Sequence, residues 1–248
     1  TNLWGWDKPG TEVNVTASWS SQKWTAKTDK DGKWQVKVQT PKASYTPLSI
    51  TFDDGEPVTL SNILAGEVWV CAGQSNMEMP VKGFGNCPVE GYNKAVVEAN
   101  QYKGIHYVKI PSVMSNKPLD DASCEWKEIS PETVGEASAT GYFFAQVVNK
   151  ALDIPVGLVM ANKGGTRVES WLDRDYLKKN TKEETDSAKI VKSKKFKWDF
   201  HYPLLWGNGT FHPILNYTVK GILFYQGCSN VGDPDGQYTQ RLADLVAQ

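Results

Sequence analysis

Three turns of the chain carry the polar side chains and glycines that acyl-transfer chemistry needs. The first turn reads AGQSNME, and in it Ser75 follows Gly73 by two residues, directly after an apolar run. A serine at a strand-to-helix turn exposes its hydroxyl, and a helix N-terminus favours the negative charge that develops when a carbonyl is attacked. Ser75 is therefore a candidate nucleophile. A plain helix N-cap is the alternative, because serine is common at that position.

The second and third turns contain donors suited to an oxyanion. The second turn, ANKGGTR, has two adjacent glycines, Gly164 and Gly165, whose bare N–H groups can point at an oxygen. One such donor contributes about 3 to 4 kcal/mol in acyl transfer. The third turn, QGCSN, places the side-chain amide of Gln226 beside a glycine. Each turn alone also fits an ordinary loop. A phosphate-binding loop is not indicated, because neither Gly-x-Gly-x-x-Gly nor Gly-Lys-Ser/Thr follows a strand here.

Four continuous apolar runs predict the strands that position these turns, at 67–71, 105–110, 154–160 and 219–225. Such runs are typical of a parallel sheet that is buried on both faces. The best helix lies between the second and third strands. It has Ser138 or Thr140 as a cap and one apolar face, made of Phe143, Phe144, Val147, Val148 and Leu152. Because ligands bind beyond the carboxyl ends of such strands, the three turns together predict one cleft.

The first sixty residues have a different pattern, in which short runs alternate apolar and polar positions. This period of two indicates β-strands. Asp31-Gly32 and Asp54-Gly55 lie between such runs, where tight hairpin turns are expected. The sequence therefore predicts two domains: a small antiparallel β-sandwich at 1–62 and an α/β domain at 63–248.

Composition excludes several classes of function. The formal net charge is −1, and the single basic run, 178–197, is interpreted as a solvated face, so we expect no nucleic-acid partner. No apolar stretch reaches membrane-spanning length, and the first residues do not have the charged and apolar pattern of a leader, with prior removal of a leader left open. Four cysteines are too few for a disulfide scaffold or a zinc site. Cys71 is expected in a strand core, and a bridge between Cys87 and Cys124 is an open alternative.

The residues of these three turns and of the strands before them resemble those of a known family. The matching blocks are GEVW with GQSNM at 66–77, GGT with ESW at 164–171, and YQG with SN at 225–230, in that order. Together they resemble the sialate O-acetylesterases, which are SGNH hydrolases that act on carbohydrate esters. The first domain is similar to the β-domain that precedes the catalytic part in bacterial members. The resemblance implies a flavodoxin-like, three-layer α/β/α domain after a jelly-roll-like sandwich.

The resemblance also implies roles for individual residues. Ser75 would attack an acetyl ester on a sugar, and the oxyanion donors would be the N–H groups of Ser75 and Gly165 (or Gly164) and the side chain of Gln226. Asn162 is a lower-ranked helper. His212 matches a segment near the cleft in the family, and Arg167 would meet the carboxylate of a sialic acid, with a surface arginine at a helix start as the alternative. No metal or cofactor is implied, and the expected location is the periplasm or the outside of the cell.

Two departures from the family pattern concern the catalytic base. Cys228 stands where the family has a glutamate, and no Asp-x-x-His block is present; the only histidines are His106, His201 and His212. An unassisted hydroxyl is a poor nucleophile, so a base is required. His212 is the only plausible substitute in this chain. We rank it below a histidine and an aspartate on further chain after Gln248, which we expect because the final helical pattern has no stop signal.

These departures leave two rival functions open. The first rival keeps the fold and changes the sugar, as in an acetyl-xylan or other polysaccharide acetylesterase. The second rival is a carbohydrate-binding protein without catalysis.

Overall fold

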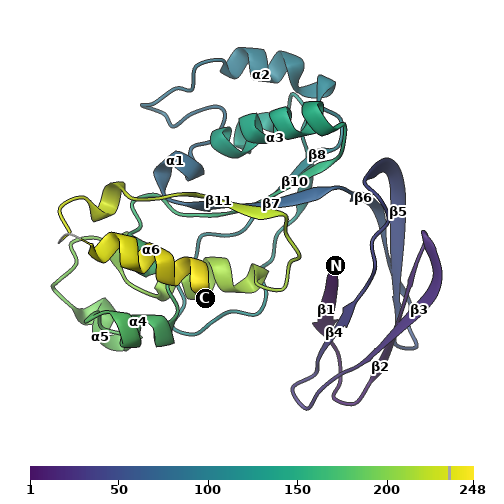
Figure 1. Cartoon of the computed structure of the whole chain (residues 1–248), viewed down its shortest axis with the longest axis horizontal. Helices are drawn as coiled ribbons and strands as arrows, with labels where there is room; N and C mark the ends of the chain where they lie inside the picture. The colour runs from purple at the N-terminus through teal and green to yellow at the C-terminus, as the bar shows by residue number, and fades with distance from the viewer. Residues whose placement is uncertain (234–235) are drawn as a thin grey trace.

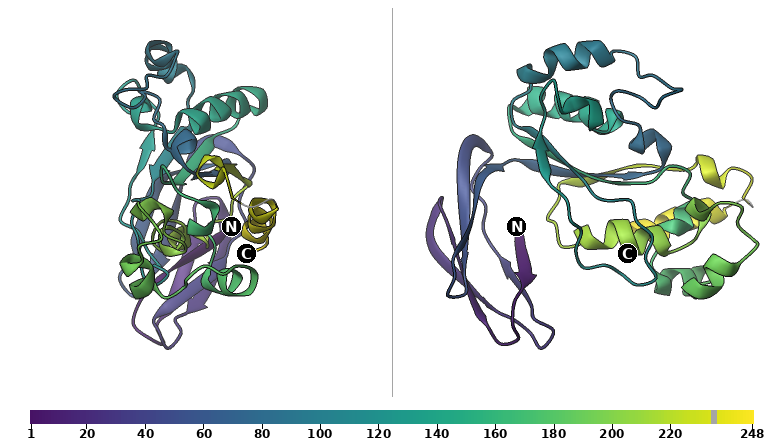
Figure 2. Two further views of the ribbon diagram at one scale, coloured as in Figure 1. Left: turned by 90° about the vertical axis from the view of Figure 1, so that its left-hand side faces the viewer. Right: turned by 180° about the vertical axis from the view of Figure 1, so that it is seen from behind.

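The computed structural model describes residues 1–233 and 236–248. It is a mixed α/β protein in which an all-β body stands beside an α/β body (Figure 1). In both further views the two bodies stay distinct, joined by the chain that runs from β6 to β7 (Figure 2). No helix in the described ranges is long and apolar enough to cross a membrane.

The all-β body consists of two antiparallel sheets. Strands β2 (Glu12–Ala17), β3 (Ser20–Lys27), β5 (Ser44–Asp53) and β6 (Val58–Ala65) form one sheet in the order β3-β2-β5-β6, and β1 (Asn2–Trp6) pairs with β4 (Lys33–Lys37) in the other. Alternate side chains from both sheets bury one apolar cluster, which includes Val15, Trp24 and Trp34. The period-two prediction of strands is therefore confirmed here.

Two details of this body differ from the sequence-based expectation. Asp54-Gly55 joins the paired strands β5 and β6, as expected for a hairpin, but Asp31-Gly32 joins β3 to β4, which lie in different sheets. Strand β6 also continues to Ala65 in the β sheet, so the expected boundary after residue 62 falls inside a strand. A Cβ on Gly66 would lie 2.1 Å from the carbonyl oxygen of Pro155, so the connection between β6 and β7 passes close to the residue before Val156.

The central sheet carries the predicted strands. Its parallel members are β7 (Glu67–Gly73), β8 (Ile105–Lys109), β10 (Val156–Asn162) and β11 (Gly221–Tyr225), in the order β11-β7-β10-β8. A short antiparallel strand, β9 (Trp126–Glu128), extends the β8 edge. All four predicted strands are confirmed, with starts or ends that differ by one or two residues. Because β10 pairs with β7 as far as Asn162 opposite Gly73, the two following turns begin side by side.

Helices lie on both faces of this sheet. In Figures 1 and 2, α2 (Tyr92–Glu98) and α3 (Ala139–Leu152) cover one face, and α4 (Arg174–Asn180), α5 (Ser187–Lys192) and α6 (Gln237–Ala247) lie on the other. The remaining helix, α1 (Ser75–Glu78), is a single turn directly after β7. Short 3-10 turns at 99–101, 134–136, 168–170, 199–201, 212–214 and 228–230 and a π turn at 207–211 complete the body.

Helix α3 occurs where it was predicted, but it buries a different face. Ser138 is its cap, and its side chain accepts a hydrogen bond from the Gly141 N–H. Val147 is 67% exposed and Leu152 is 56% exposed, whereas Gly141, Tyr142 and Ala145 are buried. A Cβ on Gly141 would lie only 2.8 Å from the Cys71 Sγ. A glycine at 141 therefore lets the helix approach the sheet closely, whereas Val147 and Leu152 of the predicted face are exposed and Val148 packs at the edge of the core.

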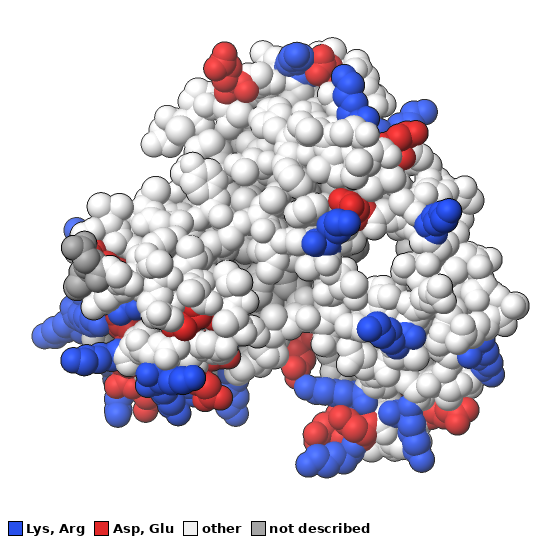
Figure 3. Space-filling view, viewed as in Figure 1, with Lys and Arg blue, Asp and Glu red and all other residues white. Residues whose placement is uncertain are grey.

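Surface charge and cysteine state agree with part of the compositional analysis. Lysines over α4 and α5 are interspersed with acidic residues (Figure 3), as in the ion pair between Lys195 and Glu183. This mixture is typical of a solvated face. Cys71 is buried in β7, and burial raises the pKa of its thiol to about 12. Cys87 and Cys124 are both free, so the bridge considered between them does not form.

Candidate active site

Ser75 lies at the turn between β7 and α1, where the chain must reverse sharply. Gly73 has a φ of 133°, and a Cβ there would lie 2.2 Å from the carbonyl oxygen of Tyr225. Glycine is therefore required at this position, both for the backbone angle and for the close approach of β11. Gln74 occupies the N-cap position of α1, so Ser75 is the first residue of the helix and not its cap. The N-cap interpretation of Ser75 is wrong, and its side chain is half-buried.

The glycine turn after β10 lies directly against Ser75. The Lys163 N–H donates to the Gly73 carbonyl at 3.0 Å, which fixes the start of this turn beside β7. A Cβ added to Gly164 would lie 3.7 Å from the Ser75 Cβ. The first two predicted turns are therefore adjacent in space, at the carboxyl ends of their strands.

The donors of these turns are not equally available. The Gly164 N–H donates to the Glu78 carboxylate at 2.6 Å, so Gly164 is already committed. The N–H groups of Ser75 and Gly165 meet no acceptor among the described residues. Of the two glycines, Gly165 is thus the one with a free donor, and its role as an oxyanion donor stays a prediction. Glu78, one helical turn after Ser75, is a site residue that the sequence analysis missed.

Gln226 connects all three turns through its side-chain amide. Its Nε2 donates to the Thr166 carbonyl at 3.0 Å, to the Asn230 Oδ1 at 2.9 Å and, at 3.3 Å, to the Gln74 Oε1. The Gln74 Oε1 also accepts from the Gly227 N–H. The amide nitrogen of Gln226 thus holds the turns together, and its role as an oxyanion donor stays a prediction. Its Oε1 is buried and has no partner among the described residues.

Asn162 supports the nucleophile turn from behind. The residue is 3% exposed, and its Nδ2 donates to the Cys71 carbonyl at 3.4 Å and to the Met77 carbonyl at 3.5 Å. These bonds join the end of β10 to both β7 and α1. The structure therefore gives Asn162 a positioning contact, while direct assistance to an oxyanion stays a prediction.

Arg167 is enclosed by carboxylates. Its guanidinium lies 3.4 Å from Glu169, 3.4 Å from Glu183 and 3.3 Å from Asp233. Burial lowers the pKa of Arg167, but the three carboxylates outweigh burial and hold it above its ordinary value. Glu169 is fully buried and also pairs with Arg241. Contact between Arg167 and a substrate carboxylate stays a prediction, and this pairing leaves the guanidinium little capacity for another anion.

None of the three histidines contacts Ser75. The His212 Nδ1 lies 2.8 Å from the Leu119 carbonyl, and His212 lines a hollow that it shares with Trp4 and Lys33 of the all-β body. His212 therefore lies at the junction between the bodies, and its role as a substitute base stays a prediction. His201 lies edge-on to Phe200, with 4.8 Å between ring centroids. Burial and, second, the charge of Arg167 lower the pKa of His201.

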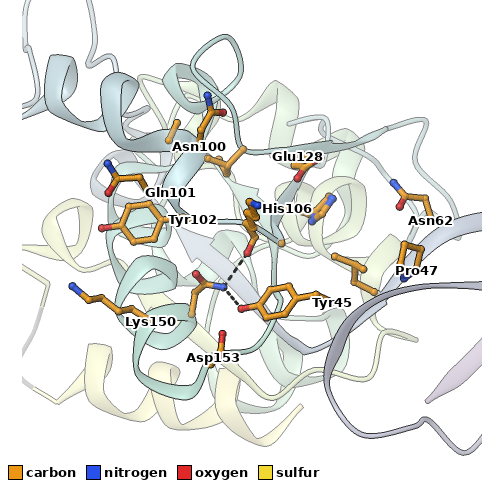
Figure 4. A pocket seen from close by; sticks show the side chains of 16 residues that line it. Tyr45, Pro47, Asn62, Asn100, Gln101, Tyr102, His106, Glu128, Lys150 and Asp153 are labelled. Atoms are coloured by element: carbon orange, nitrogen blue, oxygen red, sulfur yellow. Dashed lines mark hydrogen bonds between the residues drawn. The ribbon is translucent and has the colours of Figure 1, made fainter.

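One large hollow of the described structure lies away from this site. A cavity of about 1000 Å³ lies at the amino ends of the strands, between the two bodies (Figure 4). His106, Tyr45 and Asn149 line it, and the Asn149 amide donates to the Tyr45 hydroxyl at 3.1 Å. Ser75 and its neighbouring turns lie at the opposite ends of the same strands. His106 is therefore remote from the candidate nucleophile.

The fold and the site define a mixed α/β protein with a serine at a strand-to-helix turn, beside two further loops of a parallel sheet. The family model described as "Carbohydrate esterase, sialic acid-specific acetylesterase" matches residues 65–248. The chain belongs to this family of carbohydrate esterases.

Relatives and a solved structure agree with this assignment. The sialate O-acetylesterase of Mus musculus is 25% identical and is matched over 98% of this chain and 51% of its own length. The enzyme of Homo sapiens is 27% identical, over 92% of this chain and 45% of its own length. A crystal structure of a carbohydrate acetylesterase from Xanthomonas citri has a TM-score of 0.82 and 28% identity, and covers 100% of this chain and 52% of the other. The chain thus spans about half the length of these relatives.

Proposed function

We propose that this protein hydrolyses O-acetyl groups of sialic acid through an acetyl-serine intermediate on Ser75. The observation that carries the proposal is the contact between Ser75 and the glycine turn, where a Cβ on Gly164 would lie 3.7 Å from the Ser75 Cβ. This contact brings together the two turns that carry the free N–H groups of Ser75 and Gly165. Membership of a sialic acid-specific acetylesterase family supports the choice of substrate.

The proposed reaction has two steps. The Ser75 Oγ attacks the acetyl carbonyl, and the oxygen of the tetrahedral intermediate receives hydrogen bonds from the Ser75 and Gly165 N–H groups. The C–O bond to the sugar then breaks and leaves an acetyl-enzyme. Water attacks this ester, and acetate leaves. Both steps need a base within hydrogen-bond reach of the attacking oxygen. A base on a segment following Gln248 stays a prediction.

The architecture and location belong to the same proposal. We infer an SGNH-type, flavodoxin-like α/β/α domain preceded by a jelly-roll-like sandwich. The helices on both faces of the parallel sheet and the shared core of the two β sheets support this inference. We also propose a periplasmic or secreted protein, as an inference from the family resemblance. Fractionation of expressing cells tests the location.

Acetate release from O-acetylated sialic acid tests the function. Ser75→Ala removes the nucleophile, so we expect acetate release to fall by at least about 1000-fold, the order of loss seen when a nucleophile is removed. Ser61→Ala, an exposed serine on β6, is the matched control and is expected to keep wild-type activity. Equal activity of Ser75→Ala and wild type would reject the mechanism. A higher kcat/KM on acetylated xylan than on O-acetylated sialic acid would favour the first rival.

The second candidate function is carbohydrate binding without catalysis. Within the described residues, no hydrogen bond joins Ser75 to any of the three histidines, which favours it. Calorimetry with an O-acetylated sialic acid separates the two functions. Binding without acetate release by the wild-type protein would support this candidate, whereas release that depends on Ser75 would exclude it.

A further inference from the structure

An aromatic pair lies on the rim next to the glycine turn. Ring atoms of Phe200 would lie 2.6 Å from a Cβ on Gly165, so this ring packs on the glycine that follows Gly164. The Trp198 and Phe200 rings are stacked, with 5.8 Å between centroids and 14° between planes. Trp198 is 50% exposed. A half-open, continuous aromatic surface therefore extends outward from the Ser75 turn.

Hydrogen bonds hold the backbone of the segment 199–204 in place. The carbonyl of Asp199 accepts a hydrogen bond from the Trp206 Nε1 at 3.1 Å, and the carbonyl of Phe200 accepts one from the Ser170 Oγ at 3.3 Å. Leu204 adds a backbone bond to the Glu169 carbonyl at 2.9 Å. These bonds hold the segment against the loop after β10. The aromatic surface is thus formed in advance, which lowers the entropy cost of binding a ligand there.

A cation that is free for a ligand lies on the same surface. The Lys197 Nζ is 5.0 Å from the Trp198 ring centroid, and Lys197 is exposed and makes no ion pair within the described residues. Its neighbour Lys195 is paired with Glu183, and Arg167 is paired with three carboxylates. Lys197 is therefore an unpaired positive charge beside the aromatic pair that can meet a carboxylate of a ligand.

We infer that Trp198 and Phe200 form the subsite for the sugar ring of an acidic sugar, and that Lys197 binds its carboxylate. The inference rests on the proposed function, because it places the acetyl group toward Ser75. A sugar ring has an apolar C–H face that packs on an aromatic side chain, while its hydroxyls remain in water. An ammonium group suits a carboxylate as a point charge. An ester without a ring would make neither contact.

Selectivity between esters tests the subsite. Trp198→Ala should lower the ratio of kcat/KM for O-acetylated sialic acid to kcat/KM for ethyl acetate by about tenfold, mainly through KM for the sugar. Trp198→Phe should restore most of the ratio, since it keeps an aromatic face. Lys197→Gln should raise KM for the acidic sugar severalfold and leave an O-acetylated neutral sugar unaffected. Trp6→Ala and Lys194→Gln are the matched exposed controls.

A binding experiment separates this inference from the function. Sialic acid itself is titrated calorimetrically into Ser75→Ala, and the titration is repeated with Trp198→Ala added. Loss of sialic acid binding when Trp198→Ala is added supports the subsite. This holds even if the wild type releases no acetate, because a lack of acetate release would reject only the proposed function. Unchanged binding and an unchanged selectivity ratio in Trp198→Ala would overturn the subsite. An effect of Lys197→Gln on both sugars, or on neither, would overturn the carboxylate contact.

Discussion

At the scale of the residue, hydrogen bonds decide which groups remain available for chemistry. Gly164 and Gly165 are adjacent and equivalent in the sequence, yet only the Gly164 N–H is taken by Glu78. The location of Ser75 at a turn could be predicted because an apolar strand and a glycine precede it. The engagement of Gly164, Gln226 and Arg167 could not, since each depends on partners brought together only by the tertiary fold.

The bond between Glu78 and Gly164 leads to a stability prediction. Glu78→Ala leaves the Gly164 N–H without its carboxylate, and the loss of a charge-assisted bond at a partly buried site should lower the free energy of unfolding by about 1 to 3 kcal/mol. Glu78→Gln keeps an acceptor oxygen and should cost less. Urea unfolding measures both. Equal losses in the two variants would show that the carboxylate contributes through its charge and not through the bond.

His201 leads to a prediction about pH. Its pKa in the folded protein is lowered from 6.5 by burial and then by Arg167, so the unfolded chain takes up the proton first as pH falls. The stabilising contribution is therefore complete above pH 6.5 and is lost as pH falls through the lowered value. In His201→Gln, unfolding free energy should decline less steeply below pH 6.5 than in wild type. Parallel declines, measured by denaturant titration from pH 7.5 to 5, would contradict this.

At the scale of the element, the positions of the parallel strands follow from the apolar runs, but the packing of a helix face does not. The apolar runs of β7, β10 and β11 predict a buried sheet, and the turns after them converge because the strands are parallel. On α3, hydrophobicity selects Val147 and Leu152 for the core, whereas the structure exposes them. Distance between helix and sheet, which Gly141 sets, is not encoded in a periodicity of hydrophobic residues.

The turn after β7 gives the prediction that belongs to this scale. Gly73→Ala would place an alanine at a positive φ, with its Cβ only 2.2 Å from the Tyr225 carbonyl oxygen. Either β11 or α1 must therefore move. We expect a loss of more than about 2 kcal/mol in unfolding free energy. Gly10→Ala is the matched control, because Gly10 has a φ of 83° and nothing within 4 Å of its added Cβ. It should cost about 1 kcal/mol from backbone strain alone. Equal losses of unfolding free energy in the two variants would mean that β11 can move away from the added Cβ without further loss of stability.

At the scale of the whole molecule, the two bodies are joined at two separate places. On one side the Asn149 amide meets the Tyr45 hydroxyl across the cavity of Figure 4. On the other side the Trp4 ring packs edge-on against Tyr217 with 5.0 Å between centroids, and the Asn2 N–H donates to the Thr218 Oγ1 at 3.1 Å. The sequence predicted two domains but not these contacts, because single side chains from distant segments make them.

The contact between Trp4 and Tyr217 predicts how the bodies unfold. Each body has its own apolar cluster, so cooperativity between them depends on the contacts at their junction. In wild type we expect one calorimetric transition. Trp4→Ala removes the aromatic pair and should split or broaden this transition, with the all-β body melting first because its core is the smaller. Trp6→Ala, on the same strand and 46% exposed, should leave a single transition. A single transition at lower temperature in Trp4→Ala would instead mean that the remaining contacts, including those of Asn2 and Tyr45, are enough to couple the two bodies.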